Sequence, residues 1–212
     1  MKKFNENGRS MIEMLGVLAI IGVLSAGGLA GYAKAMFRHR LNSTLDQITM
    51  LTTNIRTMYG TQSDYTGLPK DAISLNLIPT SMIPVESTVG TDSLLTLKSP
   101  FKGDVDLETS SINGDPTTAT EAPNSAFVIT YKTLPREACV ALATADFGAG
   151  AGSGFVGVCI DTGEACTSAH AAKVGEGFAS SRAEGVPYSV TEALEECDEA
   201  EDGNATVSWK FY

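Results

Sequence analysis

The sequence predicts an α+β protein in which one long N-terminal helix, membrane-spanning in its first half, packs against an antiparallel sheet. Three observations support this fold class. Residues 14–33 are twenty residues without a charge, an apolar repeat of helical period follows them to Met58, and short strand patterns separated by turns fill the rest. These observations predict four segments: a leader at residues 1–8, the membrane-spanning half of the helix at 9–33, its amphipathic half at 34–59 and a globular domain at 60–212.

The uncharged run is long enough to cross a membrane as a helix. Twenty residues rise about 30 Å, the thickness of the hydrocarbon core of a bilayer. The alternative is a secretory signal peptide, whose apolar region is usually about 7–15 residues long and precedes its cleavage site. Here the run is longer, and the polar break lies before it. We therefore expect a membrane anchor.

Glu13 lies at the start of this apolar run. A carboxylate is costly there, and ionisable groups in membrane segments are usually functional. One interpretation is that Glu13 sits at the interface and reaches water. The other is that it pairs with a positive group once the helix is packed among other helices.

A helical repeat continues beyond the membrane edge. Because its steps of three and four residues match the period of an amphipathic helix, we expect one helix over residues 10–59, ending at Gly60. A separate helix after a break at the membrane surface is the alternative. The repeat consists of Phe37, Leu41, Leu45, Ile48, Leu51, Ile55 and Met58.

Glycines are clustered in the first half of this helix, at Gly22, Gly27, Gly28 and Gly31. Each costs up to about 1 kcal/mol relative to alanine in a helix. Gly27 and Gly31 form a small-xxx-small pair that allows close helix contact. The second interpretation is that this stretch unwinds when the helix enters an assembly of helices, and we expect close packing with some unwinding.

The body after Gly60 alternates strand and helix patterns. We expect strands at residues 94–98, 104–109, 126–132, 155–161 and 205–212, the first two forming a hairpin. Short helices are expected at residues 69–75, 135–145 and 189–200, with Thr191 as a cap of the last. The sheet is expected to pack on the apolar stripe of the long helix.

Charge and motifs exclude several functions. Residues 1–60 carry a balance of +4 and residues 61–212 a balance of −14, so we expect no nucleic-acid partner. A GxGxxG match at Gly152, Gly154 and Gly157 precedes a strand, so it predicts a surface loop. His39 and His170 are isolated, and the acidic residues near the C-terminus are expected to form a solvated face. We therefore expect that the protein is not an enzyme and that it binds no cofactor and no metal ion.

Four cysteines lie in the last third of the chain, and an even count in an exported domain favours two disulfides. Metal binding is the rival, but no pair is spaced CxxC. Cys159 and Cys166 flank a turn, which favours a local bridge and leaves Cys139 with Cys197. The other two of the three pairings remain open.

The start of the chain resembles the prepilin signal of type IV pilins and type II secretion pseudopilins. The resemblance rests on a basic leader followed by GRSMIEMLGVLAIIG at residues 8–22. It implies that a prepilin peptidase cuts between Gly8 and Arg9, that the new N-terminus is methylated, and that Glu13 is required for assembly. Arg9 departs from the usual apolar first residue of the family.

The body resembles type IVb pilins more loosely. The leader of this chain is shorter than the leaders usual in type IVb pilins. The resemblance implies a structural subunit of a pilus filament that serves adhesion, aggregation or motility. Its partners would be copies of itself, the peptidase, an assembly ATPase and a platform protein. The precursor would lie in the bacterial inner membrane and the product in an extracellular filament. Alternatives are a type II secretion pseudopilin and a minor pilin or tip adhesin.

Overall fold

The computed structural model describes residues 11–84, 97–112, 124–148, 154–161, 179–180, 187–199 and 204–212. It divides into two compact units, Met1–Arg40 and Leu41–Tyr212. The first unit contains the beginning of helix α1 (Met11–Tyr59), and the second contains the rest of α1 with the sheet and the shorter helices. We call the second unit the head.

Helix α1 is continuous over its 49 residues, which confirms the expected single helix. It ends at Tyr59, as the following glycine predicts. A Cβ atom on Gly60 would lie 2.8 Å from the carbonyl oxygen of Arg56, so the chain can turn this closely only without a side chain. The turn is closed by a hydrogen bond from the Gln62 amide to the Tyr59 carbonyl.

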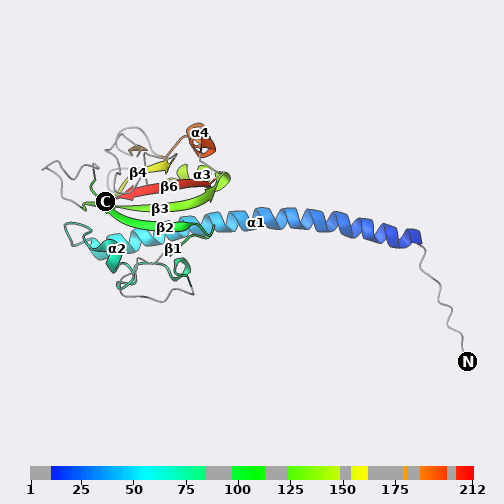
Figure 1. The fold of residues 1–212 in the computed structure, drawn as a ribbon, viewed down its shortest axis with the longest axis horizontal. Helices are drawn as coiled ribbons and strands as arrows, with labels where there is room; N and C mark the ends of the chain where they lie inside the picture. Colours follow the sequence, from blue (N-terminus) through cyan, green and yellow to red (C-terminus); the bar gives the residue numbers. More distant parts are fainter. Residues whose placement is uncertain are drawn as a thin grey trace, which may run out of the picture. The chain divides into compact units, whose positions relative to one another are not determined.

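The head contains a six-stranded antiparallel sheet with strand order β1-β2-β3-β6-β4-β5 (Figure 1). The last strand of the chain, β6, is therefore inserted between β3 and β4. Strands are present at all five predicted places, although residues 94–96 of the first lie outside the described residues, β3 runs three residues further than expected and β5 was not predicted. The bounds are β1 Leu97–Lys98, β2 Asp104–Ser110, β3 Ala126–Pro135, β4 Phe155–Asp161, β5 Ala179–Ser180 and β6 Asn204–Phe211.

The predicted hairpin between β1 and β2 passes very close to an irregularity in β3. The β3–β6 register shifts between Tyr131 and Leu134, and Thr133 in this bulge has a φ of 58°. A Cβ atom on Gly103 would lie 1.9 Å from the Lys132 carbonyl oxygen. Only glycine fits at this crossing, so Gly103 is required by the packing of one strand turn on another.

One face of the sheet carries the core, because alternate strand residues point to opposite faces. Ile55 of α1 and Ile129 of β3 are completely buried in this core. Tyr131 lies against Gln47 of α1, and its neighbour Trp209 meets Phe147, which follows helix α3 (Arg136–Ala143). Helix α1 and the segment after α3 therefore pack on the same face.

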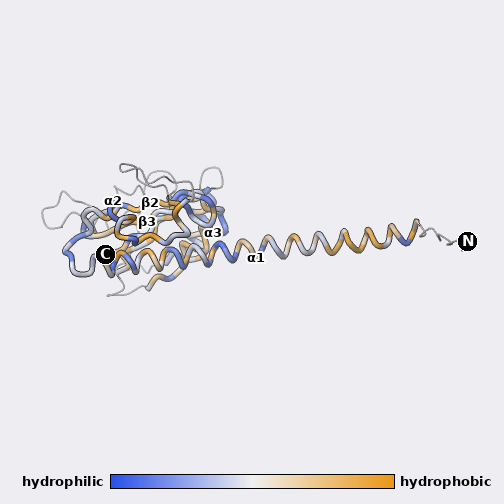
Figure 2. Tube along the Cα trace, turned by 90° about the horizontal axis from the view of Figure 1, so that it is seen from below, coloured by the Kyte–Doolittle hydropathy of each residue, from blue (hydrophilic) through white to orange (hydrophobic). Residues whose placement is uncertain are grey.

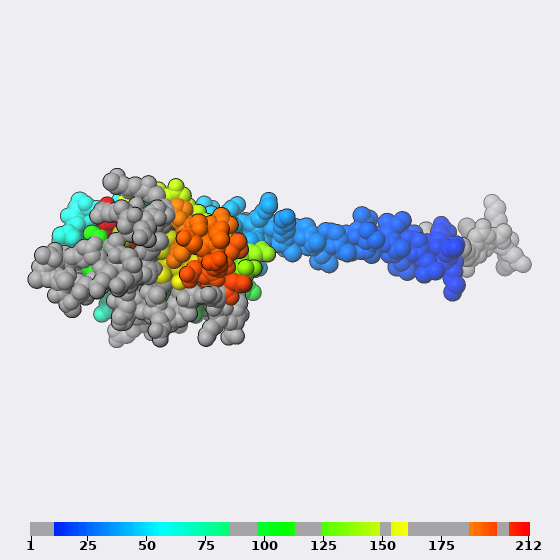
Figure 3. Space-filling view, turned by 90° about the horizontal axis from the view of Figure 1, so that it is seen from above, coloured from blue at the N-terminus to red at the C-terminus, as the bar shows by residue number. Residues whose placement is uncertain are grey.

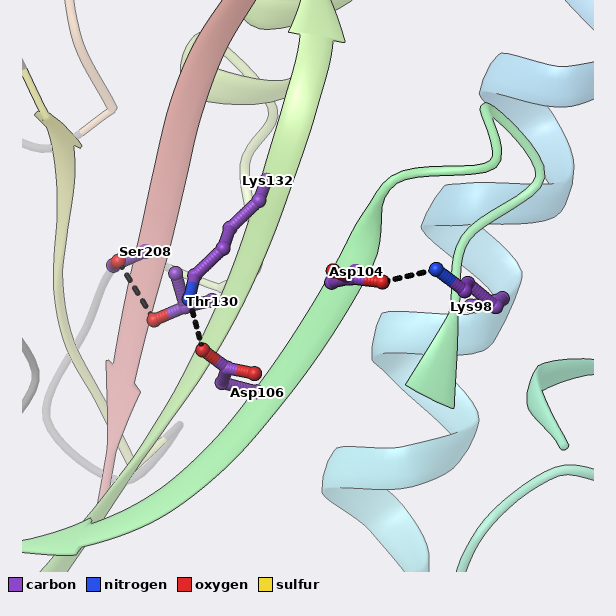
Figure 4. Close-up of polar contacts among 6 residues, drawn as sticks. All are labelled: Lys98, Asp104, Asp106, Thr130, Lys132 and Ser208. Atoms are coloured by element: carbon purple, nitrogen blue, oxygen red, sulfur yellow. Dashed lines mark hydrogen bonds and ion pairs between the residues drawn. The ribbon is translucent and has the colours of Figure 1, made fainter. Parts of the chain in front are cut away.

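The opposite face carries charged residues on β1, β2 and β3, and there the hydroxyls of Thr130 on β3 and Ser208 on β6 share a hydrogen bond of 2.9 Å (Figure 4). Lys98 pairs with Asp104, and Lys132 pairs with Asp106 at 2.5 Å. The hydrogen bond to Asp106 raises the pKa of Lys132. These pairs are about half exposed, so each contributes little to stability, about 0–1 kcal/mol.

The predicted helices of the head are present with shorter bounds. Helix α2 (Leu68–Asp71) and the 3-10 helix η1 (Thr80–Met82) follow α1, and η1 was not predicted. Helix α3 begins one residue after Pro135, which is the last residue of β3. Together with α4 (Val190–Glu199), these elements enclose the core.

The expected cap of α4 was wrong. Ser189 caps this helix, since its hydroxyl accepts the Glu192 amide at 3.3 Å and its own amide donates to the Glu192 carboxylate at 3.1 Å. This reciprocal pair is a capping box. The Ser189-x-x-Glu192 spacing is the sequence signal that identifies the correct residue.

Candidate assembly helix and disulfide-linked head

The first half of α1 exposes apolar side chains. Twelve large hydrophobic residues between Met11 and Tyr32 are exposed. This part of α1 is long and apolar enough to cross a membrane, and its most apolar stretch of 18 residues is not buried inside the protein. Figure 2 shows the apolar colouring along this stretch. Because water is a poor solvent for so much apolar surface, this half needs another environment.

Glu13 lies in the first turn of α1. Within the described part of the chain no residue forms an ion pair or hydrogen bond with it. A carboxylate at this end of a helix is favoured by the helix dipole. Gly8 and Arg9 lie outside the described residues, so the predicted cleavage between them stays a prediction.

The glycines of the first half are not required by the packing of this chain. A Cβ atom on Gly22, Gly27, Gly28 or Gly31 would meet nothing within 4 Å. The helix is nevertheless regular through all of them. Unwinding of this stretch on assembly and close approach of another helix both remain predictions.

The second half of α1 is part of the head core. Ile48, Leu51 and Ile55 are completely buried. Gln47 donates from its amide to Ser81 Oγ at 3.0 Å, and its carbonyl accepts from the Tyr131 hydroxyl at 3.4 Å. Burial raises the pKa of Tyr131 far above its usual value, so this hydroxyl remains a donor. These contacts fix α1 on the sheet.

A disulfide joins α3 to α4, as the favoured pairing predicted. Cys139 and Cys197 are bonded, with Cα atoms 6.1 Å apart and a sequence separation of 58. Arg136 Nε lies 2.9 Å from the Asp198 carboxylate and links the same two helices. The acidic helix α4 is therefore tied to the core at its C-terminal half.

The second predicted disulfide is described only in part. Cys159 lies on β4 and is disulfide-bonded. Cys166 lies outside the described residues, so its pairing with Cys159 stays a prediction.

The described part of the chain places some of the residues considered as candidates for metal binding or catalysis. No cluster of three metal-ligating side chains occurs among the described residues. His39 is exposed on α1, while His170 falls outside the described ranges. Gly154 immediately precedes β4 with a φ of 73°, and Gly157 lies within that strand, which does not resemble a nucleotide-binding turn.

One feature was not predicted, a shallow cleft at the C-terminal end of α1. It is lined by tyrosine, polar and acidic residues, and its described lining contains no histidine, cysteine or lysine. Burial raises the pKa values of Tyr59 and Tyr65, and the Thr66 amide lowers the pKa of Asp64. No sequence pattern indicates this cleft, because its walls come from distant segments. They are Tyr59, Gln62, Ser63, Asp64, Tyr65, Ile112, Ser125 and Tyr212.

Comparison with known proteins gives consistent matches. The family model named Bundlin matches residues 34–212. The major structural subunit of bundle-forming pilus from Escherichia coli O127:H6 is 30% identical over 151 residues, covering 71% of this chain and 70% of the relative. The subunit of the same name from Escherichia coli O111:H- gives the same values.

Two solved structures share the fold. The type IVb pilin from Salmonella typhi matches with a TM-score of 0.51 and 18% identity, covering 79% of this chain and 97% of the pilin. TcpA, a type IV pilin from the Vibrio cholerae El Tor biotype, matches with a TM-score of 0.52 and 17% identity, covering 82% of this chain and 99% of TcpA. At these identities the likeness concerns the fold.

Proposed function

The chain belongs to the bundlin family, and we propose that it is a structural subunit of a type IV pilus that polymerises through α1 into an extracellular filament. One observation carries this proposal. A single helix has an exposed apolar first half and a second half that is built into a folded head. Such a subunit can be held in a membrane first and packed among identical helices later.

The apolar side chains of the first half of α1 favour both the membrane-held state and the state packed among identical helices. Fully burying one large aliphatic side chain is worth about 1.5–3 kcal/mol. Lipid before assembly and neighbouring helices after assembly can each provide this burial. The open glycines support the second state, because small residues let helix backbones approach closely.

Processing prepares the helix for polymerisation. The proposed cut between Gly8 and Arg9 by a prepilin peptidase creates a free α-amine. This amine is proposed to pair with Glu13 of a neighbouring copy, because an unpaired carboxylate in a low-dielectric bundle is expensive. The requirement for this pair would set the axial register between subunits.

The remaining partners belong to the assembly machine. We propose a precursor in the bacterial inner membrane, and an assembly ATPase and platform protein that extract it. The curated relatives are major structural subunits of a bundle-forming pilus, which favours an abundant subunit over a pseudopilin or tip adhesin. The filament would serve adhesion, aggregation or motility.

The first test is the intact mass and N-terminal sequence of the protein from cells with and without active prepilin peptidase. We expect a peptidase-dependent start at Arg9 and a mass reduced by the hydrogens lost in two disulfides. The same spectrum reports methylation of Arg9. A start at Met1, or a cut after the apolar run, would contradict the proposal.

The second test is Glu13→Ala, with Asp46→Ala as the matched control. Both remove one exposed carboxylate from α1. We expect Glu13→Ala to reduce sheared filament at least about a hundredfold, because an unpaired charge in a packed bundle costs about 3–5 kcal/mol. Membrane insertion and the Cys139–Cys197 disulfide should be unchanged. Equal filament yields from the two variants would remove Glu13 from the assembly contact.

A further inference from the structure

Helix α4 has an exposed apolar ridge. Outside α1, the exposed large hydrophobic residues of the described chain are Leu75, Val190 and Leu194. Val190 and Leu194 are 61% and 40% exposed and stand four residues apart, so they are neighbours on one side of the helix. In Figure 3, α4 (orange) forms part of the visible surface of the head.

Acidic residues lie beside the apolar ridge of α4. The helix contains five carboxylates and no lysine or arginine. Two of these carboxylates already have partners, because Glu192 belongs to the capping box and Asp198 pairs with Arg136. Glu195 is exposed directly beside Leu194. The outward side of α4 therefore presents two apolar side chains flanked by a negative charge.

The chain carries a surface that complements this one, on α1 just after the apolar run. Lys34 and Arg38 are exposed and four residues apart, so they form a positive ridge. The adjacent row contains Gly31 and Ala35, which are exposed, and a Cβ atom on Gly31 would meet open space. Residues 14–45 contain no aspartate or glutamate. This surface therefore places two small residues beside two cations.

We propose that α4 of one copy docks on residues 31–38 of α1 in another copy within the filament. This inference rests on the proposed function. Val190 and Leu194 pack over the small residues Gly31 and Ala35, so that two rows of four-residue spacing interdigitate. Glu195 then lies beside Lys34 and Arg38, and the match of charge fixes the orientation.

The two surfaces are different, so the contact is heterologous. A heterologous contact leaves each end of an assembly open, and it generates a ring or a helical filament. A polymer is therefore the assembly that this contact supports, and each subunit would use both surfaces at once.

A charge exchange tests the pairing. Glu195→Lys and Arg38→Glu should each lower sheared filament about tenfold, the effect of losing one partly desolvated charge pair worth about 1.4 kcal/mol. The double variant Glu195→Lys/Arg38→Glu should recover to within about twofold of the unchanged protein. Glu137→Lys, an exposed change of the same charge on α3, should have no effect. Single variants that assemble normally, or a double variant without recovery, would overturn the docking.

Photo-crosslinking maps the contact directly. A benzophenone amino acid at Leu194 of the full chain should give a dimer in intact filaments, with the crosslink in residues 30–39. A crosslink elsewhere, to another protein or to lipid alone, would overturn the proposal. Membrane-inserted precursor and the Cys139–Cys197 disulfide are measured in every variant, so a folding failure is recognised and the crosslink then decides. If the unchanged protein forms no filament, the proposed function fails first.

Discussion

The two halves of α1 belong to one regular helix but have opposite surroundings. Before residue 33 its large apolar side chains are exposed, whereas Ile48, Leu51 and Ile55 are completely buried under the sheet. Helical propensity cannot account for the difference, because both halves are helical. The second half has its partner in the same chain, and the first half has to find its partner outside the chain.

The glycines show the same contrast. Gly22 and Gly31 in the first half face open space, whereas a Cβ atom on Gly103 in the head would overlap the Lys132 carbonyl. The glycines that the packing of their own chain does not require are the ones for which we predict a contact between chains. This comparison teaches which substitutions should affect the head and which should affect the filament.

The largest expected effect on head stability comes from emptying the buried half of α1. Ile55→Ala should lower the free energy of unfolding by about 2–5 kcal/mol, because it leaves a cavity in a packed core. Ile21→Ala, at a position 53% exposed, should leave head stability unchanged. Denaturant unfolding of full-length protein in detergent, followed by Trp209 fluorescence, measures both. Equal destabilisation would show that the two halves are not distinct.

The disulfide is expected to have the next largest effect. Replacing both Cys139 and Cys197 by serine should cost about 3–4 kcal/mol in the chain-entropy model, because the bond closes a long loop. The same unfolding measurement applies, with unchanged protein under reducing conditions as a comparison. A loss below 1 kcal/mol would mean that the remaining contacts between α3 and α4 suffice to hold α4.

Much of this fold could be predicted because its signals are local. The apolar period identified α1 to within a residue of its C-terminal end, and the strand pattern at residues 155–161 identified β4 with its observed bounds. The position of β6 between β3 and β4 could not be predicted, because pairing between distant segments leaves no local pattern. The bulge at Lys132–Thr133 is equally hidden, since it depends on how Gly103 crosses β3.

In the candidate site, too, residues with a local sequence signal could be predicted, and features that depend on packing could not. Glu13 and the Cys139–Cys197 pair were chosen from spacing and resemblance, and the structure places the two cysteines together. The ridge at Val190 and Leu194 was not predicted, because the sequence shows an amphipathic acidic helix but not which side the head leaves uncovered. That required the packing of Ala193 and Cys197 against the core.

A matched pair of glycine substitutions sharpens the comparison between the halves. Gly103→Ala should destabilise the head by about 1–3 kcal/mol, since the backbone has to move away from the Lys132 carbonyl. Gly22→Ala should stabilise the isolated helix by up to about 1 kcal/mol and still lower filament yield. Head unfolding and sheared filament are measured for both. A Gly22→Ala variant that assembles fully would show that Gly22 does not mediate close contact.

The smallest expected effect on head stability comes from the N-terminus of α4, whose capping hydrogen bonds are all made within the chain. Ser189→Ala removes the α4 capping box and should cost about 1 kcal/mol of head stability. Thr191→Ala is the control, because Thr191 was the wrong candidate for the cap, and it should cost less. Both are compared by denaturant unfolding at neutral pH.

The cap also has a predicted pH dependence. Hydrogen bonds from Ser189 lower the pKa of Glu192 in the folded protein. Since the folded pKa lies below the unfolded one, this stabilisation is present above the unfolded value and is lost as pH falls through the folded value. The difference between unchanged protein and Ser189→Ala should therefore shrink under acid conditions. A difference that stays constant with pH would assign the cap to the hydroxyl alone and leave Glu192 without a role.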